Sequence, residues 1–210
     1  LMNNLGSLKQ RGAFDNEDLK KAIEEKLEKA KTGKRVAALK TSVVKNTVNL
    51  DEETKKKVEQ VGDTQIKAKG RISASTALLI DKSGSMHQSI EVGKRIASMS
   101  SAIMADGASL YAYAFDTMAY PIQSKGTDMA SWESAFKGIY ANGGTSCGVG
   151  VEMLRRAKQR VEQIILVSDE DENNSPSFVN ALLSYMKELA IRPRIVFVKL
   201  GHSTDKIERE

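Results

Sequence analysis

The sequence predicts an α/β fold: a doubly wound, mostly parallel sheet with helices on both faces, preceded by a small helical segment. Two observations lead to this prediction. From Thr76 onward, short apolar runs rich in β-branched and aromatic residues recur, which is typical of strands buried on both faces. Helical patterns separate these runs. Strands that alternate with helices form βαβ units around a parallel sheet.

The elements follow in order along the chain. Leu19, Ile23 and Leu27 recur at helical spacing and predict a helix over about 16–31. Two further helices are expected, at 35–46 and 50–68. Strands are then expected at 76–80, 109–115, 163–168 and 194–201, a short edge strand at 117–122, and helices at about 89–104, 131–140, 147–160 and 176–190. Residues 1–70 are thus expected to form a helical segment, and residues 71–210 the sheet-bearing domain.

Composition describes an ordinary globular chain. Hydrophobic residues make up 40% and charged residues 28% of the 210 residues, and no run approaches the roughly 20 apolar residues of a membrane span. The start of the chain shows no secretory leader, and Cys147, the single cysteine, has no partner for an internal disulfide. We therefore expect a cytoplasmic protein with no membrane partner.

The positive charge is uneven along the chain. Residues 1–70 contain 16 Lys and Arg against 11 Asp and Glu, whereas residues 71–210 contain 16 of each, so the net charge of +5 lies in the first third. Such an excess is compatible with contact to nucleic-acid phosphates. The basic residues alternate with acidic ones, which equally fits the solvated faces of helices. Charge alone leaves both interpretations open and favours the solvated helices.

Acidic and hydroxyl side chains follow the expected strands. Asp81 ends the first apolar run, and Asp169 follows a later one in QIILVSDE. Thr145 lies in the glycine-rich loop NGGTSCGVG. Because ligands bind at the carboxyl ends of the strands in an open α/β sheet, we expect these three loops to converge there.

The oxygen donors at these positions suit a hard divalent cation. Ser83 and Ser85 alternate behind Asp81, so their side chains point the same way, and Gly84 allows a tight turn between them. Carboxylates combined with neutral hydroxyls match the octahedral oxygen coordination of Mg²⁺, with Mn²⁺ and Ca²⁺ as alternatives. Zinc is disfavoured because His87 is the only nitrogen or sulfur ligand nearby.

These residues also carry a family resemblance. DKSGSM at 81–86 resembles the Asp-x-Ser-x-Ser of the metal-ion-dependent adhesion site (MIDAS) in von Willebrand factor A domains, Thr145 resembles that site's threonine, and Asp169 its second aspartate. The resemblance covers about 73–205 and implies a Rossmann-like von Willebrand A fold. It further implies that Ser83, Ser85 and Thr145 bind the cation directly and Asp81 and Asp169 directly or through water. A free coordination position would accept an acidic group from a protein partner.

A narrower resemblance covers the whole chain. LMNNLGSL, GKRVAALKT and ALLIDKSGSM together resemble the C-terminal part of the Ro autoantigen (TROVE) family. In that family a ring of helical repeats binds noncoding RNA and a von Willebrand A domain closes the ring. The resemblance implies that residues 1–70 are the end of a truncated repeat module, and that noncoding RNA is a partner of the full-length protein.

Several alternatives accompany this interpretation. Asp81 and Asp169 would alternatively be capping or turn residues, and Thr145 a helix cap near Ser146. Cys147 is expected to be a buried small hydrophobe. The acidic run 169–172 is expected to be a solvated loop. The function expected is that of a binding module and not an enzyme; the alternatives are a von Willebrand A domain for protein binding or adhesion without an RNA role, and a metal-assisted phosphoryl hydrolase.

Overall fold

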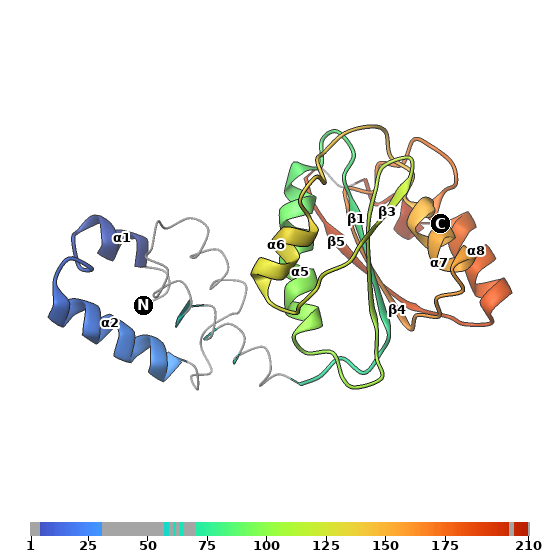
Figure 1. Cartoon of the computed structure of the whole chain (residues 1–210). Helices are drawn as coiled ribbons and strands as arrows, with labels where there is room; N and C mark the ends of the chain where they lie inside the picture. Colours follow the sequence, from blue (N-terminus) through green and yellow to red (C-terminus); the bar gives the residue numbers. More distant parts are fainter. Residues whose placement is uncertain are drawn as a thin grey trace. The chain divides into compact units, whose positions relative to one another are not determined.

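The structure of the chain is a computed structural model that describes residues 5–30, 57, 58, 61, 64, 70–201 and 204–209. The chain divides into two compact units, Leu1–Arg71 and Ile72–Glu210. Figure 1 labels the helices and strands of both units, and each unit has its own core of buried hydrophobic residues. The helix expected at 35–46 lies outside the described residues, and so does most of the one expected at 50–68.

The first unit contains two described helices, α1 (Leu5–Gln10) and α2 (Glu17–Ala30). Helix α2 confirms the helix expected at 16–31. Ile23 and Leu27 are buried as its spacing predicts, but Leu19, in the first turn, is 51% exposed. Helix α1 was not expected. It forms where Leu5, which is fully buried, packs in the same cluster as Ile23 and Leu27.

The second unit is built on a five-stranded sheet in the order β3-β2-β1-β4-β5. The strands are β1 (Thr76–Asp81), β2 (Leu110–Phe115), β3 (Ala119–Ile122), β4 (Gln163–Ser168) and β5 (Arg194–Lys199). All neighbours pair in parallel except β3, which runs antiparallel to β2. Pro121 lies in β3, at the edge of the sheet where its missing N–H is tolerated. The predicted α/β fold with a mostly parallel sheet is confirmed.

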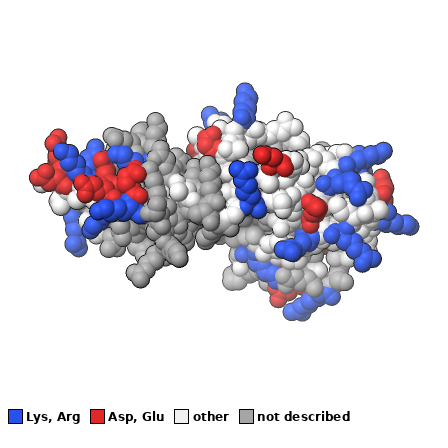
Figure 2. Space-filling view, turned by 90° about the horizontal axis from the view of Figure 1, so that it is seen from below, with Lys and Arg blue, Asp and Glu red and all other residues white. Residues whose placement is uncertain are grey.

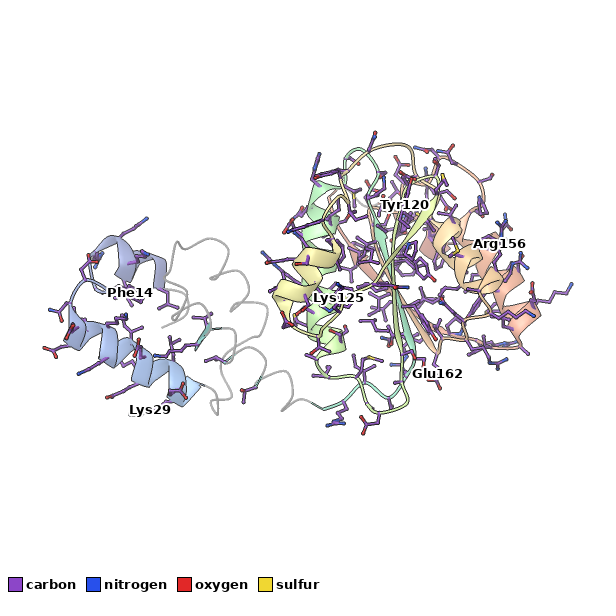
Figure 3. The ribbon with its side chains drawn as sticks, viewed as in Figure 1. Phe14, Lys29, Tyr120, Lys125, Arg156 and Glu162 are labelled. Carbon is purple, nitrogen blue, oxygen red and sulfur yellow. The ribbon has the colours of Figure 1, made fainter. Side chains whose placement is uncertain are left out.

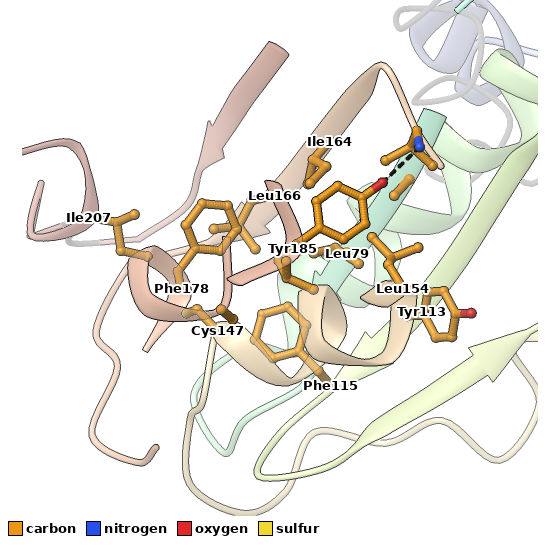
Figure 4. Close-up of a cluster of buried hydrophobic side chains, with 14 of the residues drawn as sticks. Leu79, Tyr113, Phe115, Cys147, Leu154, Ile164, Leu166, Phe178, Tyr185 and Ile207 are labelled. Atoms are coloured by element: carbon orange, nitrogen blue, oxygen red, sulfur yellow. Dashed lines mark hydrogen bonds between the residues drawn. The ribbon is translucent and has the colours of Figure 1, made fainter. Parts of the chain in front are cut away.

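Helices cover both faces of this sheet (Figure 1). Helices α5 (His87–Ser101) and α6 (Met129–Ala135) lie on one face, and α7 (Gly148–Arg156) and α8 (Phe178–Leu189) lie on the other. Side chains alternate along β1 between the two cores: Leu78 and Ile80 face α5, and Leu79 faces α7 (Figure 4). Within the described residues, no helix is long and apolar enough to cross a bilayer.

Strand order determines where a ligand can enter. Strand β1 has β2 on one side and β4 on the other, so the chain leaves β1 in one direction and later returns on the opposite side. At such a switch point the loops diverge and leave a crevice beyond the carboxyl ends of the strands. Asp81 is the last residue of β1, and Asp169 directly follows β4. The two aspartates therefore lie at the switch point.

Candidate metal centre

Asp81 is the most constrained residue at this edge. Its side chain is fully buried, and both carboxylate oxygens accept hydrogen bonds. The Ser83 amide donates to Oδ1 over 2.8 Å, and the Ser168 hydroxyl donates to Oδ2 over 2.7 Å. These donors come from the loop after β1 and from the end of β4. The carboxylate is therefore held between the two strands of the switch point.

Electrostatics at Asp81 favour the arrival of positive charge. Burial raises the pKa of its carboxyl, hydrogen bonds from Ser83 and Ser168 oppose that effect, and the negative charge of Asp169 raises the pKa further. Asp169 is thus close enough to act on Asp81 through space. A cation between two such carboxylates would relieve both their repulsion and the cost of burying their charge.

The serines of the motif lie on the turn after Asp81. Ser83 is 4% exposed, whereas Ser85 is exposed, so the motif runs from the interior to the surface. The amide of Gly84 donates to the carbonyl of Gly143 over 3.1 Å, which joins this turn to the loop that carries Thr145. Within the described residues the side chain of Ser85 forms no hydrogen bond, so nothing in that part of the chain competes for its hydroxyl.

Thr145 is held through its backbone by the loop after β4. Its amide donates to the Asn173 side chain over 3.0 Å, and its carbonyl accepts from the amides of Asn173 and Asn174. The side chain is 4% exposed, and its hydroxyl has no hydrogen-bond partner among the described residues. The capping alternative is wrong, because α7 begins at Gly148 and its N-cap residue is Cys147. The Thr145 hydroxyl is therefore available for a ligand.

The acidic run after β4 differs from the expected solvated loop. Glu170 is 1% exposed, its carboxylate forms an ion pair with Lys199 at 3.2 Å, and it accepts a hydrogen bond from the Ile207 amide. Glu172 accepts from the Phe178 amide over 2.9 Å, at the start of α8. Only Asp171 is exposed as expected. Glu170 adopts a left-handed backbone conformation, with φ at 64°, and its side chain is buried, whereas Asp169 is half-buried.

A buried ion pair beside the site was not predicted. Lys82 is 8% and Asp116 7% exposed; the Lys82 ammonium donates to Asp116 and lies 4.9 Å from the centre of the Tyr120 ring. Burial, the largest single effect, would raise the pKa of Asp116, but the hydrogen bond and charge of Lys82, together with hydrogen bonds from the Met118 and Thr117 amides, lower the pKa overall. Asp116 directly follows the apolar run of β2, as Asp81 ends that of β1. That position was a usable sequence signal.

This pair joins the loops that carry the predicted ligands. The Ser146 amide donates to the Asp116 carbonyl over 2.8 Å, and the Asn142 amide donates to the Lys82 carbonyl over 2.7 Å. Lys82 itself stands between Asp81 and Ser83. The segment around Thr145 is therefore fastened on one side to Lys82 and Asp116, and on the other to Asn173.

The donor set fits a hard divalent cation. Asp81, Ser83, Ser85, Thr145 and Asp169 all supply oxygen, and all lie on the three loops that the hydrogen bonds above join. Among the described residues no group of three or more His, Cys, Asp or Glu is arranged so that it could hold a metal ion, so a ligand set there depends on hydroxyls as well as carboxylates. Neutral oxygens beside one or two carboxylates are what Mg²⁺ and Mn²⁺ accept.

Cys147 is not a nucleophile in this arrangement. Its side chain is fully buried in the core between the sheet and α7, as expected (Figure 4). Burial, followed by the charge of Asp81, raises the pKa of its thiol far above the usual range. A thiol in this state supplies neither a thiolate for catalysis nor a soft metal ligand.

Comparison with known proteins adds information on the fold. No protein-family model and no curated relative matches the sequence. The crystal structure of the Ro (RSR) protein of Deinococcus radiodurans matches with a TM-score of 0.70 and 15% identity, over 98% of this chain and 47% of that one. The chain thus spans about half the length of that protein.

Two other solved structures are similar at lower scores. A von Willebrand factor type A protein from Catenulispora acidiphila matches with a TM-score of 0.46 and 19% identity, over 60% of this chain and 34% of that one. Proximal thread matrix protein 1 from the mussel byssus, with a zinc-occupied MIDAS motif, matches with a TM-score of 0.48 and 13% identity, over 63% of this chain and 39% of that one. The match to the Deinococcus radiodurans protein shows that this chain shares its fold with part of that Ro protein.

Proposed function

We propose that the second unit is a binding module that holds a divalent cation, Mg²⁺ in the first place, and uses it to bind an acidic group of a protein partner. The observation that carries the proposal is the buried Asp81 carboxylate, which is fixed by Ser83 and Ser168 and acted on by the charge of Asp169. Ser83, Ser85 and Thr145 would complete the site with neutral oxygens.

Residues of the chain have distinct roles in this proposal. Asp81 and Asp169 supply the negative charge. The hydroxyls of the other three residues would bind the ion without neutralising its charge. A cation that keeps part of its positive charge attracts a carboxylate from a partner. Because Ser85 is exposed, the partner would approach from its side of the turn. We propose binding without catalysis, which the unreactive environment of Cys147 supports.

We further propose that the chain is part of a cytoplasmic RNA-binding protein. The support is the fold shared with the Ro protein together with the excess of Lys and Arg in residues 1–70. On this proposal noncoding RNA binds the full-length protein, and the second unit contributes the cation-dependent contact to a protein partner.

Calorimetric titration of Mg²⁺ and of Mn²⁺ into the chelator-treated chain tests the cation site. We expect saturable binding of one ion, lost in Asp81→Asn and weakened about tenfold or more in Thr145→Val, since each substitution removes a ligand oxygen and nearly preserves shape. Asp171→Asn is the matched control: it neutralises an exposed acid of the same loop and should leave binding unchanged. No binding by the native chain, or equal binding by Asp81→Asn, would refute the proposal.

A further inference from the structure

Basic side chains gather at the edge of the sheet opposite the candidate metal centre. They lie in two segments, residues 155–162 between α7 and β4 and residues 187–194 between α8 and β5. We call these segments together the basic edge; its cations are Arg155, Arg156, Lys158, Arg160, Lys187, Arg192 and Arg194, and its acids are Glu162 and Glu188. Figure 2, which views this side of the molecule from below, shows Lys and Arg outnumbering Asp and Glu over the second unit.

Hydrogen bonds join the two segments into one surface. Arg160 donates to the Leu189 carbonyl at the end of α8, and the Arg194 amide donates to the Glu162 carbonyl over 2.8 Å. Gln163 and Arg194 are partners in the register of β4 and β5. Figure 3 shows Glu162 at the lower end of the sheet and Arg156 pointing outward from the end of α7. The residues that directly precede or begin β4 and β5, namely Lys158, Arg160, Arg192 and Arg194, therefore lie toward this end of the sheet, whereas Arg156 lies higher, beside α7.

Helix ends account for part of this charge. Arg155, Arg156 and Lys187 lie in the last turns of α7 and α8, where positive side chains offset the helix dipole. Arg155 and Arg156 also pair with Glu152, and Arg155 with Glu188. These three residues alone would therefore have a local structural explanation.

The same explanation does not extend to Lys158, Arg192 and Arg194. All three are exposed and lie beyond the ends of the helices. Among the described residues, no carboxylate pairs with any of them. These three cations and Arg160 lie on two segments that hydrogen bonds hold together, so their positive charges add to a field that attracts an anion.

The charge of the second unit is segregated, although its total is zero. Residues 71–210 contain 16 Lys and Arg and 16 Asp and Glu, yet seven of the cations belong to the basic edge. Asp81, Asp116 and the acidic run 169–172 lie at the opposite end of the strands, where Lys82, Lys199 and Lys206 offset only part of their negative charge. An anionic polymer would therefore be repelled from the metal edge and attracted to the basic edge.

We propose that the basic edge binds the sugar-phosphate backbone of a nucleic-acid strand without reading its bases. Five of the seven cations are arginines, whose planar guanidinium groups bind phosphate oxygens in pairs. No exposed large apolar side chain of the described residues lies in 155–162 or 187–194, so the edge lacks the anchors of a membrane-surface element. This surface belongs to the second unit and lies at the opposite end of the strands from the cation site.

The test measures binding of a fluorescently labelled oligouridine to the full chain by anisotropy, in chelator, between about 50 and 200 mM salt. The variant is Arg192→Gln with Arg194→Gln. Each lost phosphate contact reduces the magnitude of the negative slope of log K against log salt by about 0.7. We therefore expect the slope to become less steep by about 1.4 and the affinity to fall about 25-fold at 0.1 M salt. Any contribution of residues 1–70 remains in this variant.

The matched control is Lys125→Gln with Lys137→Gln, which removes two exposed positive charges elsewhere in the second unit (Lys125 in Figure 3). The control should bind as the native chain does. An unchanged slope in the Arg192 and Arg194 variant, or an equal loss in the control, overturns the proposal. So does native binding to phosphatidylserine vesicles without binding to oligouridine. Because the chelator removes divalent cations, none of these outcomes depends on the cation site.

Discussion

At the scale of single residues, two buried carboxylates, Asp81 and Asp116, lie at or beside the candidate metal centre, and their negative charges have different partners. Asp81 has two hydrogen-bond donors and a neighbouring carboxylate but no basic partner among the described residues, whereas Asp116 has Lys82. A buried carboxylate without a counter-ion is costly, and a bound cation would offset that cost. The two aspartates therefore have different roles: Asp81 is suited to bind an ion and Asp116 to hold the loops.

The pair of Lys82 and Asp116 gives a prediction about stability. Lys82→Met and Asp116→Asn should each lower the free energy of unfolding by about 3 kcal/mol, because each leaves a buried charge without its partner. The double variant should lose clearly less than the sum of the two, with a coupling energy of about 2 kcal/mol. Urea unfolding of the four proteins measures this. Additive losses would mean that the pair contributes no interaction of its own.

The residue scale also shows what sequence patterns miss. Asp81, Ser83, Thr145 and Asp169 were identified because an acid or a hydroxyl at the end of a strand has a recognisable position. Glu170 was expected to be solvated, since a run of four acids has no apolar signal. Its partners Lys199 and Ile207 are far along the chain, so only the folded structure brings them together.

At the scale of elements, an ion-pair network connects α7 to α8. Glu152 accepts hydrogen bonds from Arg155 and Arg156 within α7, and Arg155 also pairs with Glu188 of α8. The two helices cover one face of the sheet and pack into the same core. Tyr185 of α8 is buried in this core, and its hydroxyl donates a hydrogen bond to the Gln159 carbonyl. Polar contacts at the helix surfaces thus supplement a packed interface.

The network predicts a dependence of stability on pH. The hydrogen bonds from Arg155, with the one from Arg156, lower the pKa of Glu152 from 4.5 to about 2. A carboxyl with a lowered pKa stabilises the fold above its unfolded pKa, and the contribution is lost as the pH falls from about 4.5 toward 2. The native chain should therefore be more stable than Glu152→Gln at pH 7, and this difference should shrink by pH 3. Urea unfolding at both values measures it; a constant difference would exclude ionisation as the cause.

Elements were largely predictable because their signals are local. Strand β4 has the expected bounds of 163–168, and β1, β2 and β5 differ from expectation by a residue or two. The predicted ends of the helices were less accurate than those of the strands. Helix α7 ends at Arg156 and not at 160, because Lys158 adopts a left-handed backbone conformation that interrupts the helix. Helix α1 had no sequence signal, since it is short and depends on the burial of Leu5.

At the scale of the whole molecule, the chain is two units with separate cores. The cores of the second unit are drawn entirely from residues of Ile72–Glu210, and the described core of the first from residues before Arg71. A unit with its own packed core is expected to fold alone.

This separation predicts that residues 72–210 fold without the first 71. The fragment should show the circular dichroism of an α/β protein and a single cooperative urea transition, because both of its cores remain complete. The comparison is with the full chain under the same conditions. A broad, non-cooperative transition in the fragment would show that its stability requires the first unit.

The sequence by itself determined the α/β class, the order of most elements and the candidate ligands Asp81, Ser83, Ser85, Thr145 and Asp169, because apolar periodicity and polar residues at strand ends are local features. Only the tertiary structure decided that Lys82 pairs with Asp116, that Glu170 is buried, and that the segment of Arg160 and Glu162 lies beside the start of β5 at Arg194. Those contacts join segments that are far apart in the chain, and their geometry is set by strand order and register, which no local pattern specifies.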